Sequence, residues 1–159
     1  TQELDRLLEL RREVRVPLAL AVIPSGAHDP LARRLGPLAE VTVLQHGFAH
    51  ANHAPADEKK IELGNHRPAD QVFGELIAGQ EKLASLFSLK SLPVLVPPWN
   101  RIDEALAAGA APEAASDGFI SRPMALWKPQ QESLALLDRA SWVFSMVLFR
   151  SFIFSPSMP

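Results

Sequence analysis

Two long segments of the chain place apolar side chains at a helical spacing. Residues 1–15 carry leucines and a valine between charged residues, and residues 69–87 repeat this pattern with larger apolar side chains. Because apolar positions that recur every three or four residues form one stripe along a helix, both segments are predicted to be amphipathic helices. Shorter helices are expected at residues 29–38 and 102–110.

Short, continuous apolar runs lie between these helices. They are PLALAVI at residues 17–23, VTVL at 41–44 and PVLV at 93–96, with GFIS at 118–121 as a weaker fourth. Runs without polar alternation are typical of strands buried on both faces, as in parallel sheets. Strands that alternate with helices over short connections predict an α/β fold, a parallel sheet or barrel whose first three strands are parallel neighbours.

Three polar loops directly follow the predicted strands. They comprise residues 24–29, 46–53 and 98–100. In α/β folds the carboxyl ends of the strands lie at one edge of the sheet, where ligands usually bind. We therefore expect the three loops to share one rim.

The composition narrows the chemistry available at this rim. The 159 residues suit one domain, and the formal net charge of −2 gives no basic excess for nucleic acid or for an anionic membrane. There is no cysteine, so a metal site would use His, Asp or Glu. The opening TQELDRLL is charged and is not a signal peptide, which makes the cytoplasm the default expectation. The oligomeric state stays open.

The loop after the second predicted strand, within LQHGFAHANHAP, holds three of the five histidines. His46 and His50 are spaced i, i+4, and His53 follows three residues later. Two imidazoles at this spacing can face one ion if the backbone makes a helical turn, and zinc accepts nitrogen ligands. The alternative is that His46 packs or hydrogen-bonds at the strand end while His50 and His53 are solvated.

The segments QHGFAHANHAP, EKKIELG and LPVLVPPWNR together resemble the polysaccharide deacetylases of the NodB-homology type, also called carbohydrate esterase family 4. The zinc motif of that family is His-Ser/Thr-x-x-His. His46 and His50 match its two histidines, whereas Gly47 replaces the hydroxyl residue that usually supports the loop.

A second family motif, Arg-x-Pro-aromatic, is matched in part. Pro98 and Trp99 match its proline and aromatic residue, and Val96 stands where the arginine would be. The resemblance covers roughly residues 18–102 and implies part of a distorted (β/α) barrel of the polysaccharide deacetylase type.

The resemblance implies a metal-dependent hydrolase that removes acetyl groups from a carbohydrate, with zinc or another divalent metal bound by His46 and His50. The first family motif, an Asp-Asp pair that supplies the general base and the third zinc ligand, is absent, as are the C-terminal motifs. Asp29 is a candidate substitute as base or ligand, and His53 is one as ligand. For Asp29, the alternative is a helix N-cap.

The resemblance also implies a division of the chain. Residues 1–120 are expected to form a partial deacetylase-like α/β domain, truncated at its start. Residues 121–159 match no family pattern and are expected to pack on the same domain. Because family does not guarantee chemistry, the alternatives are a non-catalytic relative that binds carbohydrate or a partner, and a truncated inactive product.

Two further groups of residues bear on substrate binding. Pro98, Trp99 and Asn100 are predicted to contact the carbohydrate, with core packing as the alternative for Trp99 and a helix N-cap as the alternative for Asn100. The charged run from Glu58 to Glu62 is expected to be a solvated face, and the alternative is a rim contact or a salt-bridged lid.

Overall fold

The computed structural model describes residues 2–110 and 125–126. The elements in chain order, with η marking a single turn of 3₁₀-helix, are α1 (Gln2–Val14), β1 (Leu18–Val22), η1 (Pro24–Gly26), α2 (Asp29–Leu35), β2 (Val41–His46), α3 (Ala69–Phe87), η2 (Ser88–Lys90), β3 (Ser91–Val96), η3 (Pro98–Asn100), α4 (Glu104–Ala110) and β4 (Ala125–Leu126). The helix predicted at residues 69–87 is confirmed at its full length as α3.

The strands form one parallel sheet in the order β1-β2-β3-β4. β1 pairs with β2 in unbroken register, and the pairing of β2 with β3 ends at His46 opposite Val96. The prediction that the first three strands are parallel neighbours is confirmed. The described residues leave this sheet open and do not close it into a barrel.

A bulge interrupts the pairing of β2 with β3. Val43 lies opposite Ser91, whereas Gln45 lies opposite Leu95, so β3 contains more residues than β2 between the same two rungs. Beyond the bulge the register is regular again through His46 and Val96. The bulge therefore determines which residue of β3 lies level with His46.

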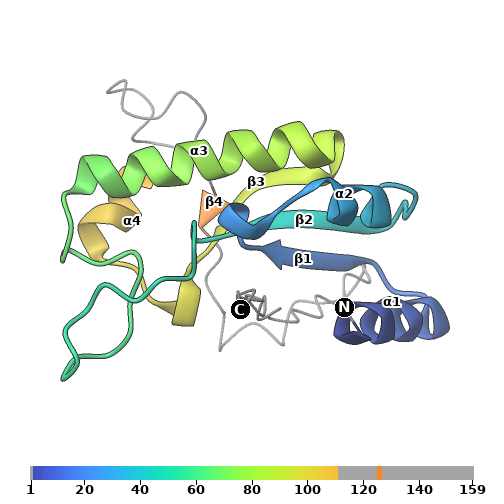
Figure 1. Ribbon diagram of the computed structural model, residues 1–159, viewed down its shortest axis with the longest axis horizontal. Coiled ribbons are helices and arrows are strands. Elements are labelled where there is room, and N and C mark those ends of the chain that lie inside the picture. The colour runs from blue at the N-terminus through green and yellow to red at the C-terminus, as the bar shows by residue number, and fades with distance from the viewer. Residues whose placement is uncertain (1, 111–124, 127–159) are drawn as a thin grey trace, which may run out of the picture.

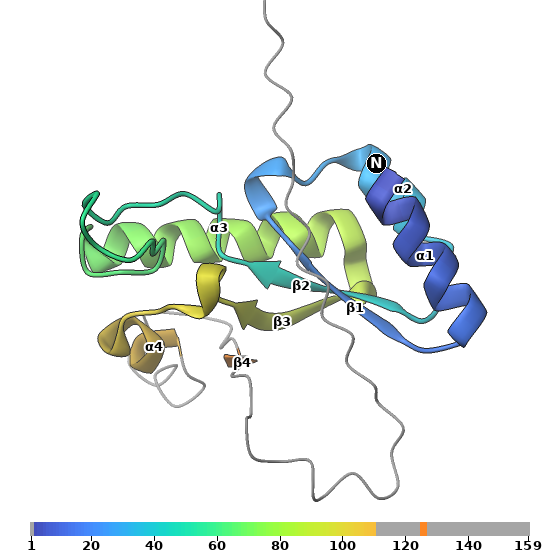
Figure 2. The ribbon, with the colours of Figure 1, turned by 90° about the horizontal axis from the view of Figure 1, so that it is seen from below.

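The helix α3 runs along one side of the sheet (Figures 1 and 2) and joins the two main hydrophobic clusters. Near its carboxyl end, Leu83 and Phe87 pack with residues of α1, β1 and β2. Near its amino end, Val72 and Leu76 pack with Leu95 of β3 and with α4. Burying each such side chain contributes about 1.5–3 kcal/mol to stability, so α3 holds the strands at fixed positions relative to one another.

The strands point toward the end of the molecule that carries the segment 47–68 and α4 (Figure 1). The carboxyl ends of β2 and β3 therefore open onto that segment, as the alternation of elements predicts. None of the described helices is long and apolar enough to cross a membrane.

Two expectations concern the later part of the chain. The strand expected at residues 118–121 lies outside the described residues, as does nearly all of the segment 121–159. Within that segment the structure describes β4, which pairs in parallel with Val94 and Leu95 of β3 and was not predicted from the apolar pattern.

Candidate functional site

His46 is the last residue of β2, and its side chain is only 2% exposed. Its Nδ1 atom lies 2.8 Å from the carbonyl oxygen of Val96, the residue opposite it in the sheet. A carbonyl oxygen can only accept a hydrogen bond, so Nδ1 carries the proton and Nε2 keeps a free lone pair. That nitrogen is the one available to bind an ion or to accept a proton.

Burial also determines the protonation of His46. Desolvation lowers the pKa of this imidazole below its usual value of 6.5, and the neighbouring His50 lowers it further, although the bond to Val96 acts in the opposite direction. The net effect keeps His46 neutral at pH 7. A neutral imidazole is the form that can bind a metal.

His50 is brought back toward His46 by the tight turn that follows β2. Gly47 and His50 both have a left-handed backbone conformation, with φ of 56° at each residue. The two imidazole rings lie 5.0 Å apart between centroids and are inclined by 47°. The structure therefore brings the two predicted metal ligands together, and His50 is half-buried rather than fully solvated.

Trp99 joins the histidine pair from the end of β3. Its ring centroid lies 4.3 Å from that of His50. Trp99 and Asn100 both have positive φ, at 53° and 56°. Each residue other than glycine in a sparsely populated backbone region costs about 1–3 kcal/mol, and such residues concentrate at binding and catalytic sites. Among the described residues other than glycine, three of the five with positive φ (His50, Trp99 and Asn100) follow the strand ends of β2 and β3, and the other two are Arg15 and Ser88.

Asn100 itself is exposed and does not cap α4. Its backbone N–H donates to the carbonyl of Pro97 at 3.0 Å, inside the turn η3. The capping role belongs to Asp103, whose carboxylate accepts from the N–H of Ala105 at 3.0 Å. The alternative that Asn100 is a helix N-cap is therefore wrong, and its side chain is free to contact a ligand.

Asp29 and His53 do not complete a metal site with the histidine pair. Asp29 is exposed in the first turn of α2, where His28 occupies the N-cap position expected for Asp29. His53 is half-buried, and its backbone N–H donates to the carbonyl of Ile61 at 3.0 Å. Within residues 2–110 and 125–126, no three or more His, Asp or Glu side chains lie close enough to hold one metal ion.

The donor set therefore fits a metal in part. His46 and His50 supply two imidazoles, and a catalytic zinc typically has three protein ligands. The neutral tautomer of His46 suits a ligand, but the described residues bring no third His, Asp or Glu side chain to the pair as a ligand.

Glu62 departs from the expectation of a solvated charged face. Its neighbours Glu58, Lys59 and Lys60 are exposed, but Glu62 is only 1% exposed. Its Oε1 atom accepts from the backbone N–H of Ala49 at 2.7 Å and from that of Phe48 at 3.3 Å. The position of Glu62 between two apolar residues and a glycine, in IELG, is the only signal in the sequence that separates it from the rest of the run.

Gln45 is a second contributor that the pattern of the sequence does not indicate. Its side-chain amide Nε2 donates to the carbonyl of Gly47 at 3.1 Å and to that of Leu76 at 3.0 Å. It therefore ties the start of the histidine turn to α3. The side chain is 2% exposed, so these bonds form away from competing water.

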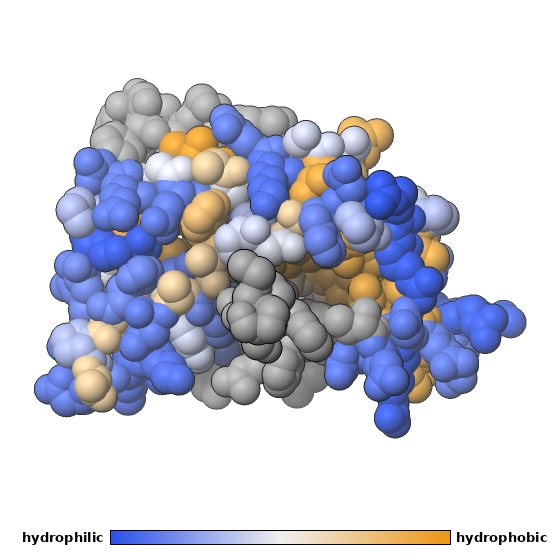
Figure 3. Space-filling view, viewed as in Figure 1, coloured by the Kyte–Doolittle hydropathy of each residue, from blue (hydrophilic) through white to orange (hydrophobic). Residues whose placement is uncertain are grey.

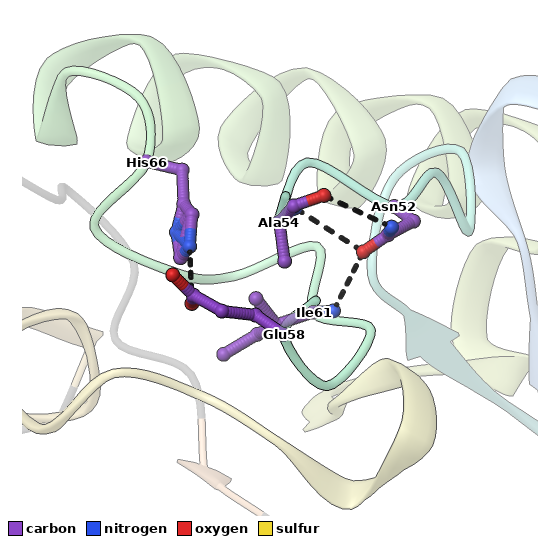
Figure 4. A network of polar contacts seen from close by, with 5 residues as sticks. All are labelled: Asn52, Ala54, Glu58, Ile61 and His66. Atoms are coloured by element: carbon purple, nitrogen blue, oxygen red, sulfur yellow. Dashed lines mark hydrogen bonds and ion pairs between the residues drawn. The ribbon is translucent and has the colours of Figure 1, made fainter. Parts of the chain in front are cut away.

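The rest of the segment 47–68 is organised by a second polar network (Figure 4). The side-chain oxygen of Asn52 accepts from the N–H of Ala54 at 3.2 Å and from that of Ile61 at 3.0 Å. At the outer end, His66 and Glu58 lie 3.0 Å apart. These bonds close the segment on itself, so it leads back to Glu62 along a defined path.

The surface at this end of the molecule is mostly hydrophilic. Figure 3 shows mostly blue, polar residues over the half that carries the segment 47–68, whereas orange, hydrophobic residues lie between blue ones over the half that carries β1 and α1. A polar ligand would suit the first half.

No protein-family model matches this sequence, and neither a curated protein nor a solved structure matches it.

Proposed function

We propose that this chain is part of a distorted (β/α) barrel related to the polysaccharide deacetylases, and that its rim binds a divalent metal, with zinc as the first candidate, beside a carbohydrate. The observation that carries the proposal is the His46–His50 pair at the end of β2, with Nε2 of His46 left free by the bond to Val96. A histidine that binds a metal commonly donates its other ring N–H to a backbone carbonyl, as His46 does here.

The carbohydrate is supported by the residues at the end of β3. Trp99 is half-buried and in contact with His50, and Asn100 is exposed beside it. An aromatic ring with one polar edge offers both an apolar face for a sugar ring and a hydrogen-bond donor. Pro98, which precedes Trp99, is buried, and its Cγ atom would lie 2.6 Å from a Cβ atom on Gly47.

When bound, the metal would polarise the acetyl carbonyl and activate a water molecule. The residues of the described chain bind and orient: His46 and His50 hold the ion, and Trp99 and Asn100 hold the sugar. A second candidate function is carbohydrate binding without hydrolysis. It is favoured because the described residues bring no third His, Asp or Glu side chain to the histidine pair as a metal ligand.

The test is a titration of the metal-free chain with Zn²⁺ by calorimetry at neutral pH. We expect His46→Ala and His50→Ala each to weaken binding by about tenfold or more, because each removes one of the two proposed ligands. His28→Ala, which removes an exposed histidine at the start of α2, is the matched control. Absence of binding by the unaltered chain, or equal weakening by the control, would contradict the proposal.

A further inference from the structure

We propose that Glu62 is the positioning residue of the rim: its carboxylate holds the turn 47–50 so that the imidazole of His50 faces His46 and Trp99. The importance of this positioning for metal binding rests on the proposed function. The positioning itself rests on the contacts of Glu62 alone.

The first support is the pair of bonds to the turn. One carboxylate oxygen of Glu62 accepts from the consecutive amides of Phe48 and Ala49, between Gly47 and His50. A bond from a backbone N–H to a carboxylate is about twice as strong as a neutral one. Because Glu62 is buried, water cannot replace this acceptor without opening the segment.

The second support is the fit of Gly47 against the other carboxylate oxygen. A Cβ atom on Gly47 would lie 1.9 Å from Oε2 of Glu62 and 2.6 Å from Cγ of Pro98. The φ of 56° at Gly47 also disfavours any side chain there. The carboxylate of Glu62 therefore leaves room only for glycine at position 47. This accounts for glycine at the position where the family that the sequence resembles has a hydroxyl residue.

The third support is that the backbone around Glu62 is itself fixed. Its neighbour Leu63 forms a parallel bridge with Ile102, and the carbonyl of Leu63 accepts from the N–H of Asp103 at 2.8 Å. These bonds attach Glu62 to the chain that follows η3. One carboxylate thus connects the turn after β2 to the segment after β3, and both of those parts carry residues of the rim.

Oε2 of Glu62 is buried and has no hydrogen-bond partner among the described residues. A buried oxygen without a partner costs free energy and persists only where the surrounding structure holds the group in place. Loss of the carboxylate would leave two amides without an acceptor. The turn would then relax, and His50 would move away from Trp99.

The experiment measures the position of His50 directly, by NMR on the metal-free chain. The ring of Trp99 shifts the ring protons of His50, and Trp99→Leu defines complete loss of that shift. We expect Glu62→Ala to lose most of the shift and Glu62→Gln, which keeps an acceptor oxygen, to retain most of it. Glu58→Ala removes an exposed carboxylate of the same segment that bonds to His66 and not to the turn, and should leave the shift unchanged.

Two further measurements complete the test. If Glu62→Ala does not fold, amide exchange in Glu62→Gln replaces it: the Ala49 N–H should exchange about tenfold faster, since a charged acceptor has become neutral. Zinc affinity, measured separately, should fall about 10–100-fold in Glu62→Ala. An unaltered His50 shift in Glu62→Ala, or unaltered exchange in Glu62→Gln, would overturn the positioning role. If Glu62→Ala loses the His50 shift but the unaltered chain binds no zinc, the positioning role of Glu62 stands and only the metal proposal is overturned.

Discussion

The rings of His50 and Trp99 lie 4.3 Å apart between centroids and are inclined by 56°. One comes from the turn after β2 and the other from the turn after β3, so this contact links the two loops that carry the candidate site. Both residues have positive φ, which places each side chain where an ordinary strand extension would not. Any ligand held by His50 would therefore lie beside an aromatic face.

This contact predicts that Trp99 contributes to carbohydrate binding. Trp99→Ala should weaken the binding of chitin oligomers several-fold, because one aromatic contact contributes about 0.5–1.5 kcal/mol. Trp99→Phe keeps a ring and should lose less. The measurement is an NMR or calorimetric titration of each variant. Equal affinity in the unaltered chain and Trp99→Ala would contradict the prediction.

The chain is expected to be a poor deacetylase even with zinc added. General-base catalysis contributes roughly 10²–10⁴-fold, and the carboxylate at the histidine turn, that of Glu62, is buried and accepts from two backbone amides. The described residues also bring no third His, Asp or Glu to the pair as a metal ligand. The measurement is acetate release from chitin oligomers and acetylated xylan with Zn²⁺ or Co²⁺ present. Turnover as fast as that of an intact deacetylase would refute the prediction.

Stability should depend on the protonation of His46. Burial lowers the pKa of this imidazole in the folded chain below the unfolded value of 6.5, so the unfolded chain binds the proton more tightly. The free energy of unfolding is therefore fully retained above pH 6.5, and it falls as the pH drops from 6.5 through the folded pKa. Urea unfolding across this range should show a weaker pH dependence in His46→Gln. An identical dependence in both proteins would show that His46 is not the group responsible.

Two glycines of α3 should respond in opposite directions to the same substitution. A Cβ atom on Gly79 would lie 2.6 Å from Nε2 of Gln45 and 2.9 Å from Cγ of Pro24, whereas one on Gly74 would meet nothing within 4 Å. Gly79→Ala should therefore lower the free energy of unfolding by about 1–3 kcal/mol. Gly74→Ala should raise it by about 0.5–1 kcal/mol, because alanine favours the helix. Chemical denaturation measures both, and the same sign for both variants would contradict this account.

The helix α3 could be predicted from the sequence because its apolar residues recur at a helical spacing. Val72, Leu76 and Leu83 recur on one face of α3 and are all buried there. The end of β2 was placed too early, at residue 44, because a polar residue was taken to end the strand. Gln45 and His46 continue it, since each finds a buried hydrogen-bond partner that belongs to another element.

Residues of the candidate site could be predicted only where a residue type that can bind a metal lies close to the end of a predicted strand. His46 and His50 meet both conditions. Glu62 does not meet the second, and its role depends on Phe48 and Ala49, which reach it only once the segment 47–68 has folded back. Charge alone indicates solvent exposure, and it cannot reveal that two backbone amides lie opposite this carboxylate. The strained backbone at Trp99 is likewise a property of the assembled strand ends.

The bulge between β2 and β3 limits which changes of chain length the rim can accept. Two steps along β2, from Val43 to Gln45, correspond to four steps along β3, from Ser91 to Leu95. Successive side chains of a strand point to opposite faces of the sheet. Because β3 has two extra residues, an even number, Leu95 and Val96 point to the faces they would occupy without the bulge. Adding or removing one residue there would reverse both sides and take the carbonyl of Val96 away from His46. Natural or engineered length variants of β3 that keep the histidine pair should therefore differ from this chain in steps of two residues.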